Sequence, residues 1–199
     1  MSSARASAHR AALASSNPGK ARELEALWPG WSIEPLDMAL APAEEGSTFW
    51  ANALEKARFG RTLAPEIPWV LGEDSGIEAS ALGGAPGLRS ARFAGAEASD
   101  EQNVNRLIAA VAAASDRRVR YVSELSGIGL DGTVLRGRGI LAGTLAHAPR
   151  GSEGFGYDPI FIPDGESATV AELGDGWKAR HSHRAQAARA LRQAIEALS

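Results

Sequence analysis

Two adjacent carboxylates, Glu73 and Asp74, follow the apolar run Trp69–Leu71 and precede Ser75. A short apolar run that ends in polar residues predicts a buried strand, so both acids should emerge together where that strand leaves the core. Carboxylates held side by side repel each other, and the pKa of one rises unless a cation lies beside them. Oxygen ligands of this kind suit Mg²⁺. Taken alone, the pair is better explained by a strand followed by an ordinary polar turn.

A second candidate group consists of six consecutive residues before a helical pattern: Ser15, Ser16, Asn17, Pro18, Gly19 and Lys20. Asparagine is a favoured N-cap and proline is favoured at the first helical position, so a helix should begin here. Free backbone N–H groups at a helix start attract anions, and Lys20 adds positive charge. The spacing of a Walker A loop is absent. A well-capped helix without any ligand explains the segment about as well.

Further charges surround a second expected helix, residues 48–58. Glu44 precedes it, and Lys56 shares one face of it with Asn52 at a spacing of four residues. Glu44 would add a third carboxylate to a metal site, and Lys56 would reach a phosphate bound near the helix start. Solvated surface charges are the simpler alternative for each of these residues taken alone.

A loop with aromatic residues and a basic segment complete the candidates. Phe155 lies between two glycines in Gly154–Pro159, which leaves its ring open to a planar partner, and stacking of a base on such a ring contributes about 1–3 kcal/mol. Lys178, His183 and Arg184 introduce the last expected helix. Positive charge at a helix N-terminus is unfavourable, so an anionic or carbonyl-rich ligand is expected nearby.

The elements that position these groups alternate between strands and helices. Strands are expected at 11–14, 69–73, 119–130, 133–145 and 160–162, and helices at about 17–28, 48–58, 100–114 and from 182 onward. Asp131-Gly132 predicts a hairpin turn between the two long strands. The buried side of the last helix is expected to carry Ala185, Ala188, Leu191, Ile195 and Leu198. Intermixed strands and helices with an antiparallel hairpin predict an α/β fold with a mixed central sheet and flanking helices.

Composition narrows the class of protein. The chain has 199 residues, of which 44% are hydrophobic and 23% charged, with no internal repeat or long linker, so one domain over residues 1–199 is expected, with residues 1–10 as a flexible tail. The net charge of −3 argues against a nucleic-acid partner, and no apolar stretch reaches membrane-spanning length. The absence of cysteine excludes thiol catalysis, and the absence of a secretion signal favours the cytoplasm.

Taken together and in this order, these segments resemble the noncanonical purine nucleoside triphosphate pyrophosphatases, the inosine triphosphatase (Ham1-like) family. The matching segments are residues 15–20, 44–56, 73–95, 154–161 and 178–186. The combination of Gly-Phe-Gly-Tyr-Asp-Pro, a downstream Ser-His-Arg and an upstream Glu-Asp-Ser-Gly is highly specific, although each motif is weak or moderate alone.

The resemblance implies a Mg²⁺-dependent enzyme that cleaves ITP, dITP and XTP to the monophosphate and pyrophosphate. It also implies two lobes around a nucleotide cleft, and a homodimer. Many members carry two aspartates where this chain has Glu73-Asp74, which leaves open which of the two acids contacts the metal directly.

Residue roles follow from the resemblance by position. Asp74 matches the catalytic base, and Glu44, Glu73 and Asp74 match metal ligands. The residues that match contacts to the triphosphate are Ser15 to Lys20, Lys56 and Ser75. Those that match contacts to the base and sugar are Phe155, Gly156, Tyr157, Asp158, Lys178, His183 and Arg184.

Two other interpretations stay open. A Maf-like nucleotide pyrophosphatase shares the strand–Ser–Lys opening but lacks the aromatic loop and the Ser-His-Arg motif. A noncatalytic sensor of purine nucleotides would have no need of an aspartate that activates water, so the retained acids and lysines count against it.

Overall fold

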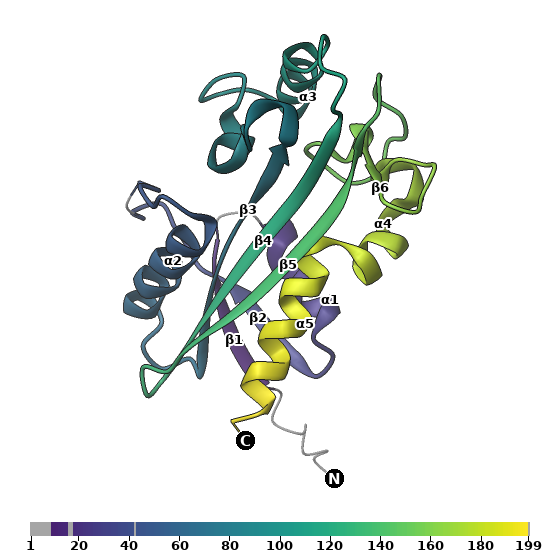
Figure 1. The fold of residues 1–199 in the computed structure, drawn as a ribbon. Coiled ribbons are helices and arrows are strands. Elements are labelled where there is room, and N and C mark those ends of the chain that lie inside the picture. The colour runs from purple at the N-terminus through teal and green to yellow at the C-terminus, as the bar shows by residue number, and fades with distance from the viewer. Residues whose placement is uncertain (1–8, 16–17, 42, 199) are drawn as a thin grey trace. The chain divides into compact units, whose positions relative to one another are not determined.

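The computed structural model describes residues 9–15, 18–41 and 43–198 (Figure 1). Its strands are β1 (His9–Ala14), β2 (Trp31–Pro35), β3 (Trp69–Ala79), β4 (Arg118–Gly129), β5 (Val134–Leu145) and β6 (Phe161–Pro163). Its α-helices are α1 (Pro18–Leu27), α2 (Phe49–Leu63), α3 (Asp100–Ala110), α4 (Val170–His181) and α5 (His183–Glu196). Short 3-10 helices cover Ser80–Leu82, Gly87–Arg92 and Asp158–Ile160.

The strands form a six-stranded mixed sheet in the order β2-β1-β3-β4-β5-β6. β1 pairs in parallel with both β2 and β3, whereas β5 and β6 pair antiparallel. β4 and β5 are neighbours joined by the turn at Asp131-Gly132, as the hairpin prediction required. The α/β fold with a mixed sheet and flanking helices is therefore confirmed. Among the described residues, none of the helices combines the length and apolar character that crossing a membrane requires.

The chain divides into two compact units, each built from segments that are separated in the sequence. Unit 1 comprises residues 1–74, 124–138 and 187–199, and unit 2 comprises residues 75–123 and 139–186. Because the dividing points fall inside β3, β4 and β5, each of these strands contributes to both units. The single domain over residues 1–199 stays a prediction.

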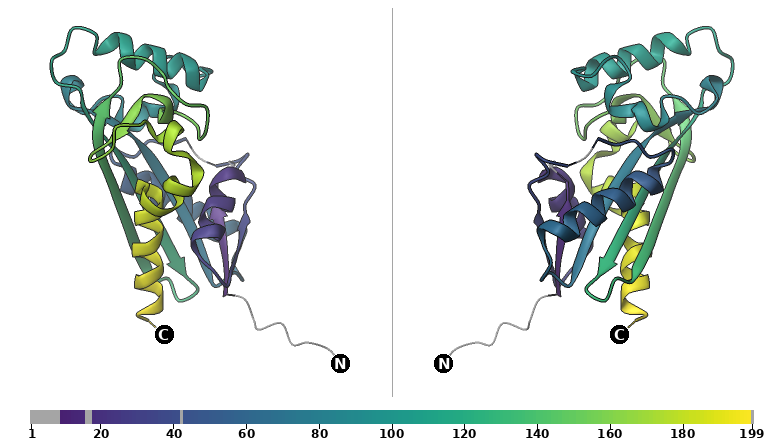
Figure 2. Two further views of the ribbon diagram at one scale, coloured as in Figure 1. Left: turned by 90° about the vertical axis from the view of Figure 1, so that its right-hand side faces the viewer. Right: turned by 90° about the vertical axis from the view of Figure 1, so that its left-hand side faces the viewer.

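Unit 1 packs helices on both faces of its strands. The alternation of β1 sends Leu13 into a cluster with Leu24 and Trp28 of α1 and Leu191 of α5, while Ala12 joins Val70 in a second cluster. The indole N–H of Trp28 donates to the carbonyl of Ala188, which ties α1 to α5. The two opposite views of Figure 2 show α5 on one side of these strands and α2 on the other.

Unit 2 has its own core. Val104 and Leu107 of α3, and Val111 directly after it, pack with Ile77 of β3 and Val170 of α4. The same cluster contains Tyr121, Leu145, Tyr157, Ile160 and Phe161. These buried positions of α3 match the helical spacing that the sequence predicts.

Several boundaries differ from the predictions. β3 does not end at Glu73 but continues to Ala79, because Ile77 and Ala79 keep alternate side chains buried beyond the acids. The chain forms β1 from His9, so residues 9 and 10 do not belong to a tail. Leu198 does not face inward, since it lies beyond the end of α5 and is 59% exposed.

Two elements were not expected from the sequence. β2 is an edge strand, where its closing proline is tolerated because the outer N–H positions need no partner. In α4, Gly174 adopts a non-helical conformation (φ 80°, ψ 175°) that interrupts the helical pattern. Two helices also differ in length from the predicted ones: α2 extends to Leu63 rather than to residue 58, and α3 ends at Ala110 rather than at residue 114.

Helix α2 approaches β3 closely at Gly72. A Cβ atom on this residue would lie 2.0 Å from the carbonyl oxygen of Ala53 and 2.6 Å from the amide nitrogen of Ala57. Both atoms are backbone, so neither can move aside. Glycine therefore lets the helix lie against the strand one residue before Glu73, where the last paired residue of β1 also lies opposite Gly72.

We expect Gly72→Ala to lower the free energy of unfolding by about 1–3 kcal/mol, because overpacking forces α2 away from β3. Denaturant titration followed by circular dichroism measures the change. Gly176→Ala is the matched control, since its Cβ would have 3.9 Å of space to Arg180 within α4. An exposed glycine inside a helix should gain about 0.4–1 kcal/mol on this replacement. Equal effects of the two substitutions would contradict the packing argument.

Candidate active site

The two carboxylates of β3 lie in different surroundings. Glu73 is only 1% exposed, and its carboxylate forms an ion pair with the ammonium of Lys20 from α1. Asp74 is 8% exposed and faces α2. Both acids therefore lie just past the paired end of β1 inside a continuing strand, and each has a lysine partner.

Helix α2 supplies the groups that hold Asp74. The side-chain amide of Asn52 donates to Oδ2 of Asp74 at 2.9 Å, and Nζ of Lys56 lies 3.3 Å from Oδ1. The same Nζ lies 2.7 Å from Oε1 of Glu44 and donates to the backbone carbonyl of Glu73 at 3.2 Å. The spacing of four residues between Asn52 and Lys56 places both on one helix face, which contacts Asp74 in this structure; the contact of Lys56 with a phosphate stays a prediction.

The electrostatics follow from burial and from crowding of like charges. Burial raises the pKa of Asp74 above its ordinary value, Lys56 and Asn52 counteract this, and Glu44 and Glu73 raise it further. Burial lowers the pKa of Lys56, but Asp74, Glu44 and Glu73 together outweigh it, and the net shift is upward. The acids thus form an anionic site that cations stabilise.

The donor chemistry of this cluster suits a hard divalent cation. Glu44, Glu73 and Asp74 offer only carboxylate oxygens, which are the ligands that Mg²⁺ prefers. Lysine ammonium groups supply the positive charge among them in this structure. Over residues 9–15, 18–41 and 43–198, no three His, Asp or Glu side chains are gathered closely enough to hold a metal ion without rearrangement. The three carboxylates therefore fit a divalent metal by their chemistry, although lysines are their partners in this structure.

The predicted phosphate segment is described only in part. Ser16 and Asn17 lie outside the described residues, and α1 begins at Pro18 as predicted. The amide of Ser15 donates to the carbonyl of Leu13 at 2.9 Å. Gly19 and Lys20 lie in the first turn of α1, so the lysine reaches Glu73 from a helix start.

The aromatic loop belongs to unit 2 and presents Phe155 to solvent. This ring is 44% exposed, and cations cover part of it: Nζ of Lys178 lies 3.8 Å from its centroid and Cζ of Arg184 lies 5.5 Å away. Gly154 has a φ of +78°, and a Cβ on it would lie 2.3 Å from Oδ2 of Asp158. The flanking glycine is therefore required by the loop, and the ring it presents is open as predicted.

Two other residues of this loop are turned inward. Tyr157 is buried, and its hydroxyl donates to the carbonyl of Ser90 at 2.8 Å. Asp158 is buried, and its Oδ2 accepts from Nζ of Lys178 at 2.8 Å and from the amide of Phe155 at 3.0 Å. Both side chains therefore hold the loop in shape, and their contact with a substrate stays a prediction. The amide of Gly156 donates to Asp100 at 2.7 Å.

The basic segment is buried rather than exposed. Arg184 is 3% exposed, and its Nη2 lies 3.4 Å from Oγ of Ser75, the residue after Asp74. His183 lies face to face with Tyr121, with ring centroids 4.5 Å apart and an interplanar angle of 10°. Lys178, on α4, pairs with Asp158. The expected anionic neighbour of this segment is therefore partly supplied by the protein.

Two residues of the site were not predicted to belong to it. Asn52 was visible in the sequence on the face of Lys56, but its bond to Asp74 depends on how closely α2 approaches β3. Tyr121 gave no signal, because one aromatic residue in a strand is normally a core residue.

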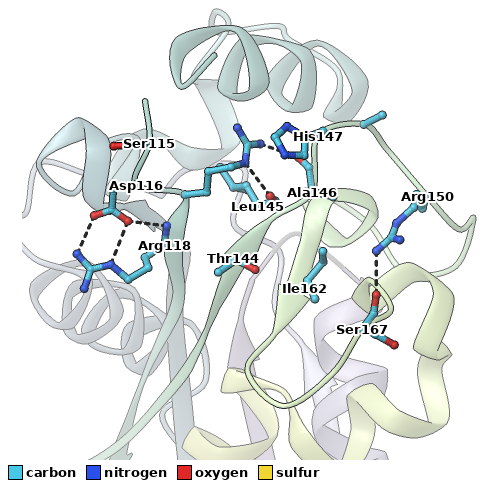
Figure 3. A pocket seen from close by; sticks show the side chains of 12 residues that line it. Ser115, Asp116, Arg118, Thr144, Leu145, Ala146, His147, Arg150, Ile162 and Ser167 are labelled. Carbon is cyan, nitrogen blue, oxygen red and sulfur yellow. Dashed lines mark hydrogen bonds and ion pairs between the residues drawn. The ribbon is translucent and has the colours of Figure 1, made fainter. Parts of the chain in front are cut away.

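A cavity of about 780 Å³ lies elsewhere in unit 2, between the start of β4 and the end of β5 (Figure 3). Arg117, which lines it, donates to the carbonyls of Leu145 and Ala146, and Arg118 pairs with Asp116. None of the candidate site residues lines this cavity. It is therefore distinct from the two charged clusters.

The fold and the two clusters together define a class: an α/β protein with a carboxylate–lysine cluster in one unit and a cation–aromatic cluster in the other. The first cluster suits phosphates and a metal, and the second suits a planar, carbonyl-bearing ring.

Comparison with known proteins shows which family has a sequence similar to that of this chain. The Ham1 family model matches residues 11–194. The dITP/XTP pyrophosphatase of Deinococcus radiodurans is 44% identical over 184 residues, which cover 92% of this chain and 90% of that protein. The dITP/XTP pyrophosphatase of Thermus thermophilus is 44% identical over 189 residues, with the same coverage.

Solved structures of Ham1 proteins have the same fold as this chain. The Ham1 protein of Staphylococcus aureus superposes with a TM-score of 0.85 at 33% identity, covering 96% of this chain and all of that one. A Ham1 protein from Coxiella burnetii gives a TM-score of 0.84 at 34% identity, covering 94% and 98%. The chain belongs to the Ham1 family.

The two tyrosines near the aromatic loop allow a test by titration. Burial raises the pKa of both Tyr121 and Tyr157 above the ordinary value, and nearby Asp158 and Asp100, respectively, raise it further. The folded protein therefore keeps protons that the unfolded chain loses above about pH 10, so stability falls as the pH rises through that value. Because the chain has two tyrosines, the absorbance of tyrosinate at about 295 nm should stay absent at pH 10.5 and appear only on unfolding. Ionisation of either tyrosine at pH 10 in the folded protein would contradict this burial.

Proposed function

We propose that this protein is a nucleoside triphosphate pyrophosphatase that converts ITP, dITP and XTP to the monophosphate and pyrophosphate. The observation that carries the proposal is Asp74, buried and held by Asn52 and Lys56, in a chain 44% identical to a dITP/XTP pyrophosphatase over 92% of its length. Such an activity removes these nucleotides from the precursor pool.

The groups of unit 1 act on the triphosphate. Lys20 and Lys56 exchange their carboxylate partners for phosphate oxygens and offset the negative charge that develops there. Asp74 takes a proton from a water molecule, whose oxygen attacks the α-phosphorus. The bond from the α-phosphorus to the bridging oxygen breaks, and pyrophosphate leaves with both electrons of that bond. The bond from Asn52 fixes the orientation of the Asp74 carboxylate.

Glu44, Glu73 and Asp74 would hold Mg²⁺, the divalent metal expected for a nucleotide pyrophosphatase. A bound Mg²⁺ supplies a positive charge that polarises phosphate oxygens. Such a cation would lower the raised pKa of Asp74, because it stabilises the ionised form of the carboxyl group.

The groups of unit 2 hold the base and sugar. The ring of Phe155 offers a stacking surface, and Lys178, His183 and Arg184 offer donors. Hypoxanthine and xanthine have a keto oxygen at C6, which accepts from a donor, whereas the amino group of adenine would face it donor to donor. A buried donor left without an acceptor discriminates strongly against the wrong ligand.

One assay tests the function against its rivals. Pyrophosphate release is measured with Mg²⁺ and ITP, XTP, ATP, GTP or dTTP, and again after EDTA treatment. We expect release from ITP and XTP that is lost with EDTA and restored by Mg²⁺. Preference for a pyrimidine nucleotide would support a Maf-like enzyme, and binding without release would support a sensor.

The role of Asp74 is tested by Asp74→Asn. Because the amide cannot accept the proton of water, kcat should fall by about 10²–10⁴-fold while binding of ITP is kept. Calorimetric binding and steady-state kinetics separate the two effects. Glu45→Gln is the matched control, since this exposed acid neighbours Glu44 and should leave kcat unchanged. Full activity of the Asp74 variant would exclude its role as base.

The role of Arg184 is tested by base preference. Arg184→Ala should lower the ratio of kcat/KM for ITP over ATP by about tenfold or more, because loss of one bond to a charged donor is worth about 1.5–3 kcal/mol. Arg184→Lys keeps the charge but not the planar fork of donors. Its ratio of kcat/KM for ITP over ATP should therefore lie between those of the wild type and of Arg184→Ala. An unchanged ratio in the alanine variant would refute the proposed role.

The homodimer and the cytoplasmic location are part of the same proposal. The homodimer rests on the resemblance to the family, and the location rests on the soluble nucleotide pool that supplies the substrate. Light scattering after size-exclusion chromatography measures the oligomeric state.

A further inference from the structure

Tyr121 occupies an unusual position between the core of unit 2 and its candidate base site. The imidazole of His183 stacks on it with centroids 4.5 Å apart at 10°, and the ring of Phe161 stacks on it at 4.5 Å and 19°. Phe161 is a core residue, whereas His183 is a proposed contact to the base. The plane of the imidazole is therefore set by a tyrosine that the core itself holds.

The hydroxyl of Tyr121 makes a second link to the same site. It donates to Oδ1 of Asp158 at 3.2 Å. The other oxygen of Asp158 accepts from Lys178 and from the amide of Phe155. Burial raises the pKa of the Tyr121 phenol well above its ordinary value, so the group is a donor over the whole physiological range.

Asp158 has little freedom of its own to adjust. Its Oδ2 lies against Gly154, where even a Cβ atom would come within 2.3 Å. Tyr121 donates to Oδ1, the oxygen that Lys178 does not hold, so each oxygen of the carboxylate has its own donor. Loss of the hydroxyl would let the carboxylate rotate, and with it the amide of Phe155 and the ammonium of Lys178.

We propose that Tyr121 is a positioning residue for base recognition, whose ring orients His183 and whose hydroxyl, through Asp158, orients Phe155 and Lys178. The inference rests on the proposed function, in which these three residues contact the base. Tyr121 is itself buried, so it acts through them.

Two substitutions separate the two parts of this role. Tyr121→Phe keeps the ring and removes the hydroxyl, whereas Tyr121→Leu removes both. Leu107→Ala is the matched control, because it opens a cavity in the same hydrophobic cluster, whereas its aliphatic side chain forms no hydrogen bond, ion pair or ring stack with the described site residues. Melting temperatures show how much each variant destabilises the protein.

The kinetic readout is the division between KM and kcat for ITP. Tyr121→Phe should raise KM by about two- to tenfold, the equivalent of one hydrogen bond, and leave kcat within about twofold. Tyr121→Leu should raise KM by more than about tenfold, since it also releases the imidazole. Leu107→Ala should lower the melting temperature without changing KM.

The structural readout is the proton spectrum of the four histidines. Stacking on Tyr121 should shift the imidazole protons of His183 upfield, and a His183→Gln variant assigns them. The shift should persist in Tyr121→Phe and disappear in Tyr121→Leu.

The possible outcomes distinguish failure of the proposed function from failure of the inference about Tyr121. Wild-type protein that releases no pyrophosphate from ITP would overturn the proposed function, and this inference with it. An active wild type whose KM is the same in Tyr121→Phe, or is raised equally by Leu107→Ala, would overturn the inference alone. If Tyr121→Leu does not fold, Tyr121→Phe and the control still decide between these results.

Discussion

The contact of α2 with β3 at Gly72 governs the catalytic half of the molecule. With no side chain at this position, the backbone of Ala53 and Ala57 lies against the strand, and the residues directly before them, Asn52 and Lys56, contact Asp74. Hydrogen-bond distances of 2.9 and 3.3 Å leave no room for a helix displaced by even one methyl group. The geometry of the acid is thus set by a residue that makes no polar contact with it.

Charge balance is the second constraint. Three carboxylates and two lysines are grouped in unit 1 so that each acid has a cationic neighbour. In the proposed function, these internal pairs would be replaced by external ones, with the lysines paired to phosphates and the carboxylates to a divalent metal. The internal ion pairs therefore balance the charge of the three acids, and each pair can be exchanged for a contact with a ligand.

The sequence predicted most of the strands and helices because their signals are local. Apolar periodicity placed the α3 core residues, Pro18 marked the start of α1, and Asp131-Gly132 marked the hairpin. Errors arose where tertiary structure overrides local signals. β3 continues past its acids because of neighbours from α3, and α4 is hidden by Gly174, although Thr169 and Glu172 form a capping box at its start.

The sequence predicted which residues lie together in the candidate site better than it predicted which of their side chains are buried. Glu44, Lys56, Glu73 and Asp74 do lie together, and so do Phe155, Lys178 and Arg184. What a single sequence cannot express is which side chains turn inward. Tyr157 and Asp158 belong to a motif of exposed appearance yet are buried, and Tyr121 joined the site through a stack between strands and helix that no spacing encodes.

The division of the chain has a consequence for its folding and its evolution. The backbone passes from one unit to the other four times, after residues 74, 123, 138 and 186. No single cut yields two halves that each contain one complete unit, so neither can be expressed, exchanged or lost as a contiguous module. Contacts between distant segments must form before either core closes, which favours slow, concerted folding. Since the first crossing falls between Asp74 and Ser75 and the last lies two residues after Arg184, insertions at these passages would disturb catalysis and folding together.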